Sequence, residues 1–442
     1  MAREQVAFQP SWGKRIVGME GLRAVAAIGV LVGHTQVHLA PSVSWGPAAP
    51  IMAVALNGLT LFFALSGFLL FRPFATALLT GERFPIIGRY AANRLLRIYP
   101  AYIVILLLVS LVLGVAYATP QLDAMTETRD TVGYMTDPAL LGMNLTMLQT
   151  LLPFSLKTGL GVAWSLTVEL VFYVVMPAVA ILTWAIVKRT RMTWGVVAAV
   201  TPIAAIFVIG AIGKLVKRSI FDGLPEGNDF IYEWGGNWYA VLARSFFAHA
   251  DLFAFGMFAA LLIAAFETGT LNHRHARPAR VASASAAVFG FVAARLAPGD
   301  FGDTAYAAAF GAVIFFVALP SGNGSPGIFA RVLETLPFRY VGLVSYSFYL
   351  WHLPVIWLMV RLGWAGENSW PGLLRSLGVA FVITLALASI TYYGVEKPAM
   401  RLKRRTDRGT GTAPRRETWP AHVNRTAPFR YKSKRVGGGS RE

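Results

Sequence analysis

Residues 21–34, with the sequence GLRAVAAIGVLVGH, decide how the chain is interpreted, because they place an arginine and a histidine on one apolar helix. Arg23 and His34 are 11 residues apart, so at about 100° per residue they fall within about 20° of one stripe. The rise between them is ~16 Å, about half the thickness of a bilayer core. If Arg23 lies at one membrane surface, His34 lies near the midplane, where an ionisable side chain is costly and indicates a functional site. Imidazole also moves protons near neutral pH, so the stretch predicts an intramembrane enzyme.

The composition of the chain favours a membrane protein over a soluble one. Its 442 residues are 55% hydrophobic and 14% charged, with a mean hydropathy of +0.54, whereas soluble proteins carry about 25% charged residues. Cysteine is absent, which excludes disulfides, thiolate metal sites and a cysteine nucleophile. The net charge of +18 does not indicate nucleic-acid binding, because residues 397–442 alone hold 14 Lys/Arg and 3 Asp/Glu, which is +11 of that total.

Apolar segments of helix-spanning length recur along the chain and predict an all-α, polytopic membrane fold with about ten transmembrane helices. The ten candidate spans lie near residues 21–40, 51–71, 98–117, 162–187, 194–213, 241–266, 278–297, 304–320, 338–360 and 376–395. The polar N-terminus runs into a first span of full length, so we expect no cleavable signal. A shorter apolar stretch at 139–155 is expected to be re-entrant or interfacial.

The distribution of charge among the loops predicts the orientation. With the N-terminus inside, inner segments hold 31 Lys/Arg and outer loops hold 8, so the positive-inside rule places both termini in the cytoplasm. We expect an integral-membrane domain over residues 1–400, and the composition, rich in Ala, Gly and Arg, suggests the inner membrane of a bacterium. A basic, disordered cytoplasmic tail is expected over 401–442, where contact with anionic lipid is its simplest role.

A cluster of arginines begins the third span, in RYAANRLLRIYP at residues 89–100. Arg94 and Arg97 are three residues apart and share a helix face. Guanidinium groups present a planar fork that suits phosphates. With Arg72 and Arg83 of the preceding loop, they form a basic cytoplasmic mouth that fits an anionic, phosphate-bearing donor. The alternative is ordinary positive-inside charge, which explains the same arginines without a donor.

The segment WSLTVELVFYVV at residues 164–175 carries a carboxylate inside the fourth span. Glu169 lies one to two turns into that span, and Tyr173 follows four residues later on the same face. A carboxylate at this depth pairs, becomes protonated or faces a cavity. The alternative is a lone glutamate that is hydrogen-bonded to a neighbouring helix.

A second intramembrane histidine occurs in SYSFYLWHLP at residues 345–354. Ser345, Tyr349 and His352 follow each other at i, i+4 and i+7 and so share a face, with His352 in the outer half of an outward-running span. His38 lies one turn outward from the first histidine and on nearly the same face. Packing and interhelical hydrogen bonds are the alternative explanation for these side chains.

Two further polar groups lie inside candidate spans. LTLFFALSGFLLF at residues 59–71 places Ser66 and Gly67 at mid-span, where small residues usually indicate close helix packing. No G-x-S-x-G elbow of a serine hydrolase surrounds Ser66. The other group, expected to pair internally or to face the same cavity, consists of Arg244, His249 and Asp251.

In their order along residues 15–400, these motifs resemble the acyltransferase-3 family of integral-membrane O-acyltransferases. The matching pieces are Arg23-x10-His34, FFALSGFLL, Arg94-x-x-Arg97 before Ile98-Tyr99-Pro100, WSLTVELVFY, YSFYLWHLP and Glu396-Lys397-Pro398. The resemblance implies acyl transfer from a cytosolic acyl-CoA to a hydroxyl of an envelope glycan, a glycolipid or an exported small molecule. It also implies that His34 is the catalytic histidine and that Arg23, Arg94 and Arg97 help to hold the donor.

On this interpretation His34 acts as a general base on the acceptor hydroxyl or as a transient acyl carrier. Glu169 is expected to orient or charge-stabilise the imidazolium, as the carboxylate does in a Ser-His-Asp triad. The residues expected to line the substrate path are His38, Ser66, Tyr173, Tyr349 and His352. No bound cofactor is expected. No metal site is expected either, since no acidic residue joins His34 and His38 in H-E-x-x-H order. The expected partners are acyl-CoA, the hydroxyl acceptor and membrane lipid.

Three alternatives stay open. The composition, rich in Ala, Gly and Arg, suggests a GC-rich bacterium, which adds a macrolide-type metabolite to the acceptors. A proton-coupled transporter would also carry intramembrane Arg, His and Glu, although the sequence shows no clear internal repeat or paired helix breaks. The third alternative is a membrane sensor or scaffold that acts through its basic tail.

Overall fold

The computed structural model describes residues 15–118, 131–190, 194–227, 229–297, 299–320 and 325–408. Within these ranges nine helices are long and apolar enough to cross a membrane, and a helix pair bent by 76° makes a tenth span. The all-α, polytopic membrane fold predicted from the sequence is therefore confirmed.

The spans follow the chain in the predicted order. They are α1 (Met19–Leu39), α3 (Gly58–Thr80), α4 (Ile87–Leu107), α6 (Trp164–Thr190), α7 (Val196–Phe221), α10 (Ala250–Glu267), α11 (Ala276–Leu296), α12 (Asp300–Ala318), α14 (Leu336–Leu343) with α15 (Ser345–Leu362), and α16 (Trp370–Thr391). The shorter helices are α2 (Ala49–Leu56), α5 (Pro138–Leu145), α8 (Asp229–Trp234), α9 (Trp238–Ala243), α13 (Ile328–Leu333) and α17 (Lys397–Arg408). The remaining elements are the 3-10 turns η1 (Gly46–Ala48), η4 (Pro153–Ser155), η5 (Phe246–Ala248) and η6 (His273–His275), the π-helical turns η2 (Leu108–Leu113) and η7 (Tyr392–Glu396), and the antiparallel strands β1 (Ala116–Tyr117) and β2 (Val132–Gly133).

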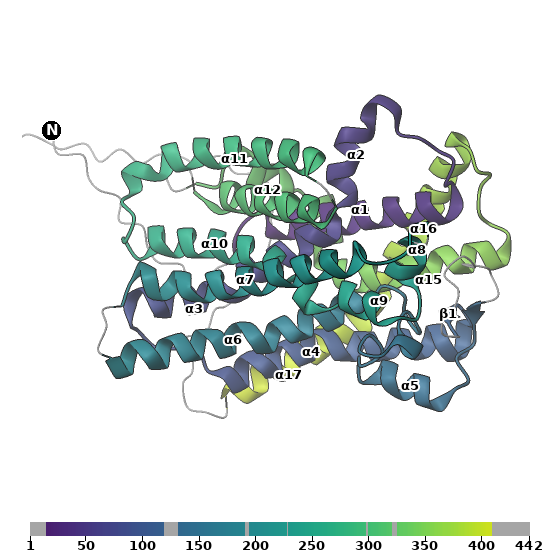
Figure 1. Cartoon of the computed structure of the whole chain (residues 1–442), viewed down its shortest axis with the longest axis horizontal. Coiled ribbons are helices and arrows are strands. Elements are labelled where there is room, and N and C mark those ends of the chain that lie inside the picture. Colours follow the sequence, from purple (N-terminus) through teal and green to yellow (C-terminus); the bar gives the residue numbers. More distant parts are fainter. Residues whose placement is uncertain are drawn as a thin grey trace, which may run out of the picture.

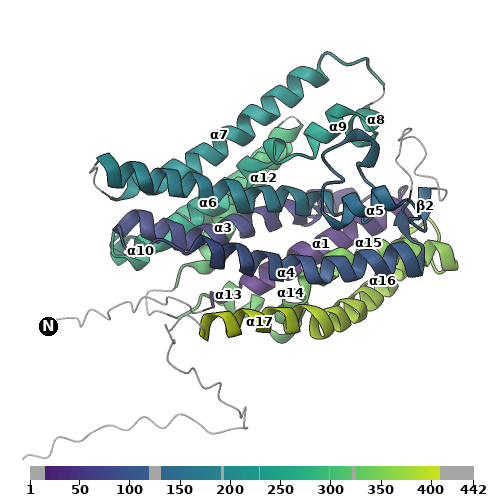
Figure 2. The same ribbon diagram turned by 90° about the horizontal axis from the view of Figure 1, so that it is seen from below.

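Ten alternating spans place the start of α1 and the end of α17 at one face of the bundle, which we call the terminal face. α5 and β1 gather at the opposite face, the right-hand end of the molecule in Figure 1. α16, η7 and α17 form one curved rod along the bundle edge in Figure 2. α17 continues the helix to Arg408, into the segment predicted as a tail from residue 401. The rest of that predicted tail, 409–442, lies outside the described residues.

A close contact between α3 and α10 lies at the centre of the bundle, and two glycines make it possible. A Cβ on Gly67 would lie 2.1 Å from the carbonyl oxygen of Phe253, and a Cβ on Gly256 would lie 1.8 Å from that of Ala64. Neither space admits a side chain, so the backbones approach as closely as small residues allow in membrane proteins. Phe68 and Phe253 are fully buried in the core beside this crossing. The packing role predicted for Gly67 is confirmed.

The helix that carries Arg23 and His34, α1, runs through the interior of the bundle and contacts α3, α14, α15 and α16. The ninth span is not the single helix predicted over 338–360, because it breaks at Val344 and α14 meets α15 at 76°. A broken helix at membrane depth is tolerated where it is buried in protein or lines a cavity. The break brings the first turn of α15 against α1, where Arg23 Nε donates to Ser345 Oγ at 3.1 Å.

The fifth span, α7, is longer than predicted because its charged end is paired. The sequence predicts Lys214 and Lys217 in a loop, but α7 continues to Phe221. Lys214 Nζ lies 2.6 Å from Asp251 Oδ2, and both groups are hydrogen-bonded to Thr304. Hydropathy alone ends a span at its first charges, whereas ion pairing with neighbouring helices allows the span to continue.

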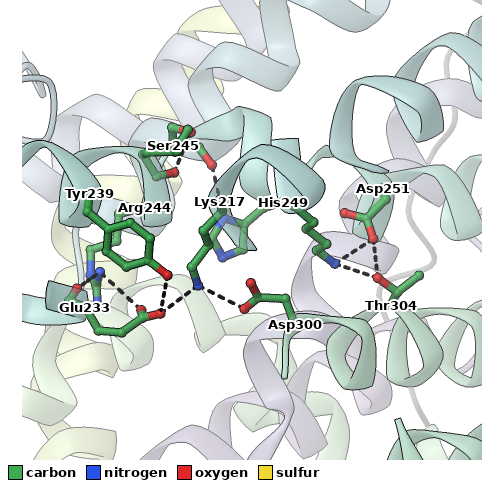
Figure 3. Close-up of polar contacts among 11 residues, drawn as sticks. Lys217, Glu233, Tyr239, Arg244, Ser245, His249, Asp251, Asp300 and Thr304 are labelled. Atoms are coloured by element: carbon green, nitrogen blue, oxygen red, sulfur yellow. Dashed lines mark hydrogen bonds and ion pairs between the residues drawn. The ribbon is translucent and has the colours of Figure 1, made fainter. Parts of the chain in front are cut away.

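The predicted group of Arg244, His249 and Asp251 is drawn in Figure 3, and its members pair with other residues instead of with one another. Arg244 precedes α10 and contacts Glu233, with its guanidinium 3.4 Å from the ring centroid of Trp234. His249 is hydrogen-bonded to a backbone carbonyl, and burial lowers its pKa to about 4, so its ring is neutral at pH 7. Burial also lowers the pKa of Arg244 to about 10. These contacts tie the short helices of the opposite face to the long ones.

Candidate active site

A cavity of about 510 Å³ opens at the terminal face between α1, α3, α4, α14 and η7. Arg15, Arg23, Arg72 and Arg97 line it, and Glu20 is the one carboxylate among the described residues of its lining. A lining dominated by one sign of charge concentrates ligands of the opposite sign. The cavity therefore suits an anion, and its volume is that of a small-molecule site.

Arg97 is held by a carboxylate from the other end of the chain. Its Nη1 lies 2.9 Å from Oε2 of Glu396, which is 1% exposed and also accepts a hydrogen bond from Ser347. The contact joins α4 to η7 and α15. The sequence predicts Arg97 at a basic cytoplasmic mouth, and in the structure Arg97 lines the terminal-face cavity. Its partner Glu396 is 299 residues away in the sequence, so no local pattern predicts the pair.

Among the described residues, Arg23 bonds a hydroxyl rather than a carboxylate. Its Nε donates to Ser345, and its guanidinium carbon lies 5.9 Å from the ring centroid of Phe62. Its other N–H donors remain for a ligand. The other two arginines of the cavity have carboxylate partners, Arg15 with Glu20 and Glu334, and Arg72 with Glu267.

Two buried donors without a hydrogen-bond partner among the described residues, on Arg94 and Tyr90, lie one turn apart on α4. The Nε of Arg94 is buried without a hydrogen-bond partner in the described part of the chain, and so is the hydroxyl of Tyr90. The two residues are at i and i+4 on α4 and share a face. Buried polar groups are normally hydrogen-bonded, so this face of α4 offers two donors to a ligand or water. Arg94 is predictable from the arginine cluster, whereas Tyr90 carries no such sequence signal.

A second cavity of about 50 Å³, which we call the chamber, lies deeper in the bundle, and Arg23 lines both cavities. Ser66 of α3 donates to Glu169 of α6, with 2.5 Å between the oxygens. The hydroxyls of Tyr349 and Ser165 are 2.7 Å apart in the same lining. Residues from four separate sequence motifs therefore meet in the chamber.

The two histidines predicted in the membrane interior are in contact. His34 Nδ1 lies 3.3 Å from His352 Nε2, and His352 is fully buried. The ring of His38 stacks on that of His34 with 5.9 Å between centroids. It also lies 5.0 Å from the Trp357 ring, in a tilted arrangement. On the other side, the His352 ring lies 5.4 Å from Tyr349, which lines the chamber. A continuous row runs from the chamber toward the opposite face, in the order Tyr349, His352, His34, His38 and Trp357.

Backbone carbonyls determine where the protons lie on the two contacting rings. His34 Nδ1 is 3.0 Å from the carbonyl oxygen of Val30, and His352 Nδ1 is hydrogen-bonded to that of Tyr349. A carbonyl oxygen only accepts, so each neutral ring carries its hydrogen on Nδ1. The lone pair of His352 is then on Nε2 and accepts from His34 Nδ1–H. The lone pair of His34 is on its own Nε2, as general-base chemistry requires.

The hydrogen bonds differ from the predicted pairing of Glu169 with His34. Glu169 is bonded to Ser66 in the chamber, and the acceptor at His34 Nδ1 is an imidazole nitrogen of His352. Tyr173 interacts with Glu169, as their spacing predicts. Trp357 was not predicted as a site residue, because its only sequence signal is an aromatic side chain five residues after His352.

Comparisons with known proteins identify the family of the chain. A family model described as an acyltransferase domain matches residues 16–393, a range that contains all ten site residues predicted from the sequence. The chain is also similar to a protein from Rhizobium radiobacter described as "Protein 2 in picA locus", with 25% identity over 211 residues. That match covers 47% of this chain and 97% of the relative. No solved structure matches the chain.

Proposed function

Because the chain belongs to the acyltransferase-3 family, we propose that it is a membrane O-acyltransferase with one substrate at each face. Acyl-CoA enters at the terminal face, and a hydroxyl of a cell-envelope glycan or glycolipid arrives from the opposite face. The observation that carries this proposal is a continuous path through the bundle. Arg23 lines both the terminal-face cavity and the chamber, and Tyr349 and His352 connect the chamber to His34. Transfer from an anionic donor to a hydroxyl is served by an anion site for the donor and a base that both substrates reach.

Acyl-CoA suits the terminal-face cavity because its phosphates match the arginine lining. We assign Arg23, Arg94 and Arg97 to the donor. Arg23 lines both the cavity and the chamber, whereas Arg94 lines neither and contributes a buried Nε that has no partner among the described residues. The proposed orientation follows the positive-inside prediction and puts this cavity in the cytoplasm of a bacterium, where acyl-CoA is available.

In the proposed reaction His34 is the general base. Its Nε2 takes the proton of the acceptor hydroxyl as that oxygen attacks the thioester carbonyl. The carbon–sulfur bond breaks, and the proton passes from Nε2 to the departing CoA thiolate. His352 accepts the hydrogen bond from Nδ1–H throughout and stabilises the imidazolium, which is the carboxylate's role in a Ser-His-Asp triad. In a two-step route the same Nε2 first carries the acyl group and then passes it to the acceptor.

Glu169 receives a different role from the one the sequence suggests. Held by Ser66, its carboxylate acts electrostatically on Arg23, so we assign it to balancing charge in the chamber and to positioning that arginine. Tyr349 lines the chamber, and Tyr173 acts through its interaction with Glu169. His38, stacked on His34 toward the opposite face, is assigned to the acceptor side.

Turnover of acyl-CoA by the full chain in nanodiscs tests the proposal. The absence of cysteine allows CoA release to be followed with a thiol reagent without background from the protein. With a lipid and glycan extract as acceptor, isotope-labelled acetyl-CoA should transfer its label to an extract component, identified by mass shift. We expect His34→Ala to abolish release and His275→Ala, at an exposed histidine, to retain it.

Two results would count against the proposal. Undiminished CoA release by folded His34→Ala protein would remove the histidine from the chemistry. Proton flux through the wild-type protein without any CoA release would favour the proton-coupled transporter instead.

A further inference from the structure

A third cavity, of about 370 Å³, lies at the opposite face beside the row of histidines. Its walls come from the end of α15, the loop after η2 and the β1–β2 pair, which Figure 1 shows at the right-hand end of the molecule. Its aromatic and charged lining residues are Tyr134, Trp357 and Arg361, and three valines complete the apolar part of the wall. Neither the family match nor the motifs of the sequence assign this cavity a role.

The guanidinium of Arg361 is fixed at the edge of the cavity. Its Nη1 donates to the carbonyl oxygens of Leu113 at 2.7 Å and Gly114 at 3.0 Å, and its carbon lies 5.5 Å from the ring centroid of Tyr134. Among the described residues nothing is bonded to its Nη2 or Nε. Gly114 has φ +58°, and a Cβ there would lie 2.7 Å from Tyr134 and 2.8 Å from Nη1 of Arg361. Because Gly114 has no side chain, Nη1 of Arg361 can bind the two carbonyl oxygens while Nη2 and Nε remain for an anion.

The inner wall of the cavity is the indole of Trp357. Its Nε1 donates to the hydroxyl of Tyr117 at 3.2 Å, which fixes the ring plane. The same indole also contacts the His38 ring at 5.0 Å between centroids, and His34 follows at 5.9 Å. One aromatic ring thus separates the cavity from the histidines of the candidate active site.

We propose that this cavity is the acceptor subsite and that it binds a sugar ring carrying an anionic group. The apolar face of the sugar ring packs on Trp357 and Tyr134, because aromatic side chains offer an apolar surface with a polar edge. The negative group, a carboxylate or a phosphate, binds the remaining N–H donors of Arg361. Small-molecule sites combine an apolar lining with a few placed polar groups in this way. The inference rests on the proposed function, since it names the chemistry of the acceptor.

Binding of three simple probes to the full chain in nanodiscs tests the subsite. Glucose, glucuronate and glucose 1-phosphate share a ring but differ in charge, and isothermal titration gives their dissociation constants. We expect at least one of the two anions to bind at least about 10-fold more tightly than glucose. Arg361→Gln should weaken that anion by about 10- to 100-fold and leave glucose unchanged. Trp357→Leu should weaken all three probes.

Controls separate loss of the subsite from loss of folding. Arg295→Gln removes an exposed arginine at the same face and should bind all probes as the wild type does. Arg361→Lys keeps the charge and should retain part of the anion preference. The two anions distinguish a carboxylate-bearing from a phosphate-bearing acceptor, and a preference for either supports the proposal. Equal affinity of the wild type for glucose and both anions, or a preference that survives Arg361→Gln, overturns it.

The binding test and the turnover test fail independently. His34→Ala should bind the preferred anion as the wild type does, because the base is not part of the subsite. Anion binding without any CoA release would leave an anionic-sugar site and reject the acyltransferase. CoA release with no effect of Arg361→Gln on the acceptor KM would keep the acyltransferase and reject the subsite.

Discussion

Replacing Lys214 by Met should destabilise the protein strongly, because it leaves a buried carboxylate without its cation. The side chains of Lys214 and Asp251 are 3% and 1% exposed, and their charged atoms are 2.6 Å apart. Removing one partner of a buried ion pair costs about 3–5 kcal/mol. Thr304 still donates to Asp251, but the other carboxylate oxygen has no partner among the described residues. We expect the free energy of unfolding to fall by about 3 kcal/mol.

A double-mutant cycle measures this coupling. Denaturant titrations of Lys214→Met, Asp251→Leu and the double variant, followed by tryptophan fluorescence, give the free energies of unfolding. The double variant should be more stable than either single one, since it buries no unpaired charge. Lys217→Met is the matched control and should cost less, because its partners Glu233 and Asp300 are 32% and 33% exposed and water can solvate them. If the losses in free energy of unfolding of the two single variants simply add in the double variant, the two charges are not coupled and the expectation is wrong.

Three further outcomes are expected. His352→Leu removes the acceptor of His34 Nδ1–H and should lower kcat by about 100-fold without changing the acyl-CoA KM. His352→Gln keeps an accepting oxygen and should retain more activity. Stopped-flow measurement of CoA release gives the kcat of both variants. Arg23→Gln should raise the acyl-CoA KM and make that KM less sensitive to salt, because it removes a cation from the donor cavity, and turnover at several ionic strengths checks this. Gly67→Ala should prevent correct folding, seen by size-exclusion chromatography, whereas Gly88→Ala, with open space at its Cβ position, should not.

Span number and order were predictable from the sequence because both depend on local hydropathy over about 20 residues. Two of the differences from the predicted spans have a clear physical cause. The end of α7 was missed because an ion pair with Asp251 keeps Lys214 inside the helix. The break at Val344 was missed because the flanking residues of α14 and α15 are as apolar as those of a straight span.

The candidate site was predictable in its residue types but not in its pairings. Helical periodicity put Arg23 and His34 on one stripe, and the structure places the arginine at the terminal-face cavity and the histidine deeper in the bundle. His34 and His352 are 318 residues apart in sequence, so no local pattern reports that they touch. The carboxylate of Glu169 was the natural partner for a histidine by analogy with a triad, and only the three-dimensional arrangement gives that carboxylate to Ser66.

Acyl transfer across a sealed membrane tests most directly whether two substrates meet at His34 from opposite faces. Acetyl-CoA would be added outside proteoliposomes that enclose the acceptor extract, and a tag in the loop between α10 and α11, on the terminal face, would report which way each molecule faces. We expect acylated acceptor only inside vesicles whose protein turns its terminal face outward, and none with His34→Ala. Equal transfer by both orientations, or transfer when acetyl-CoA reaches only the opposite face, would contradict it.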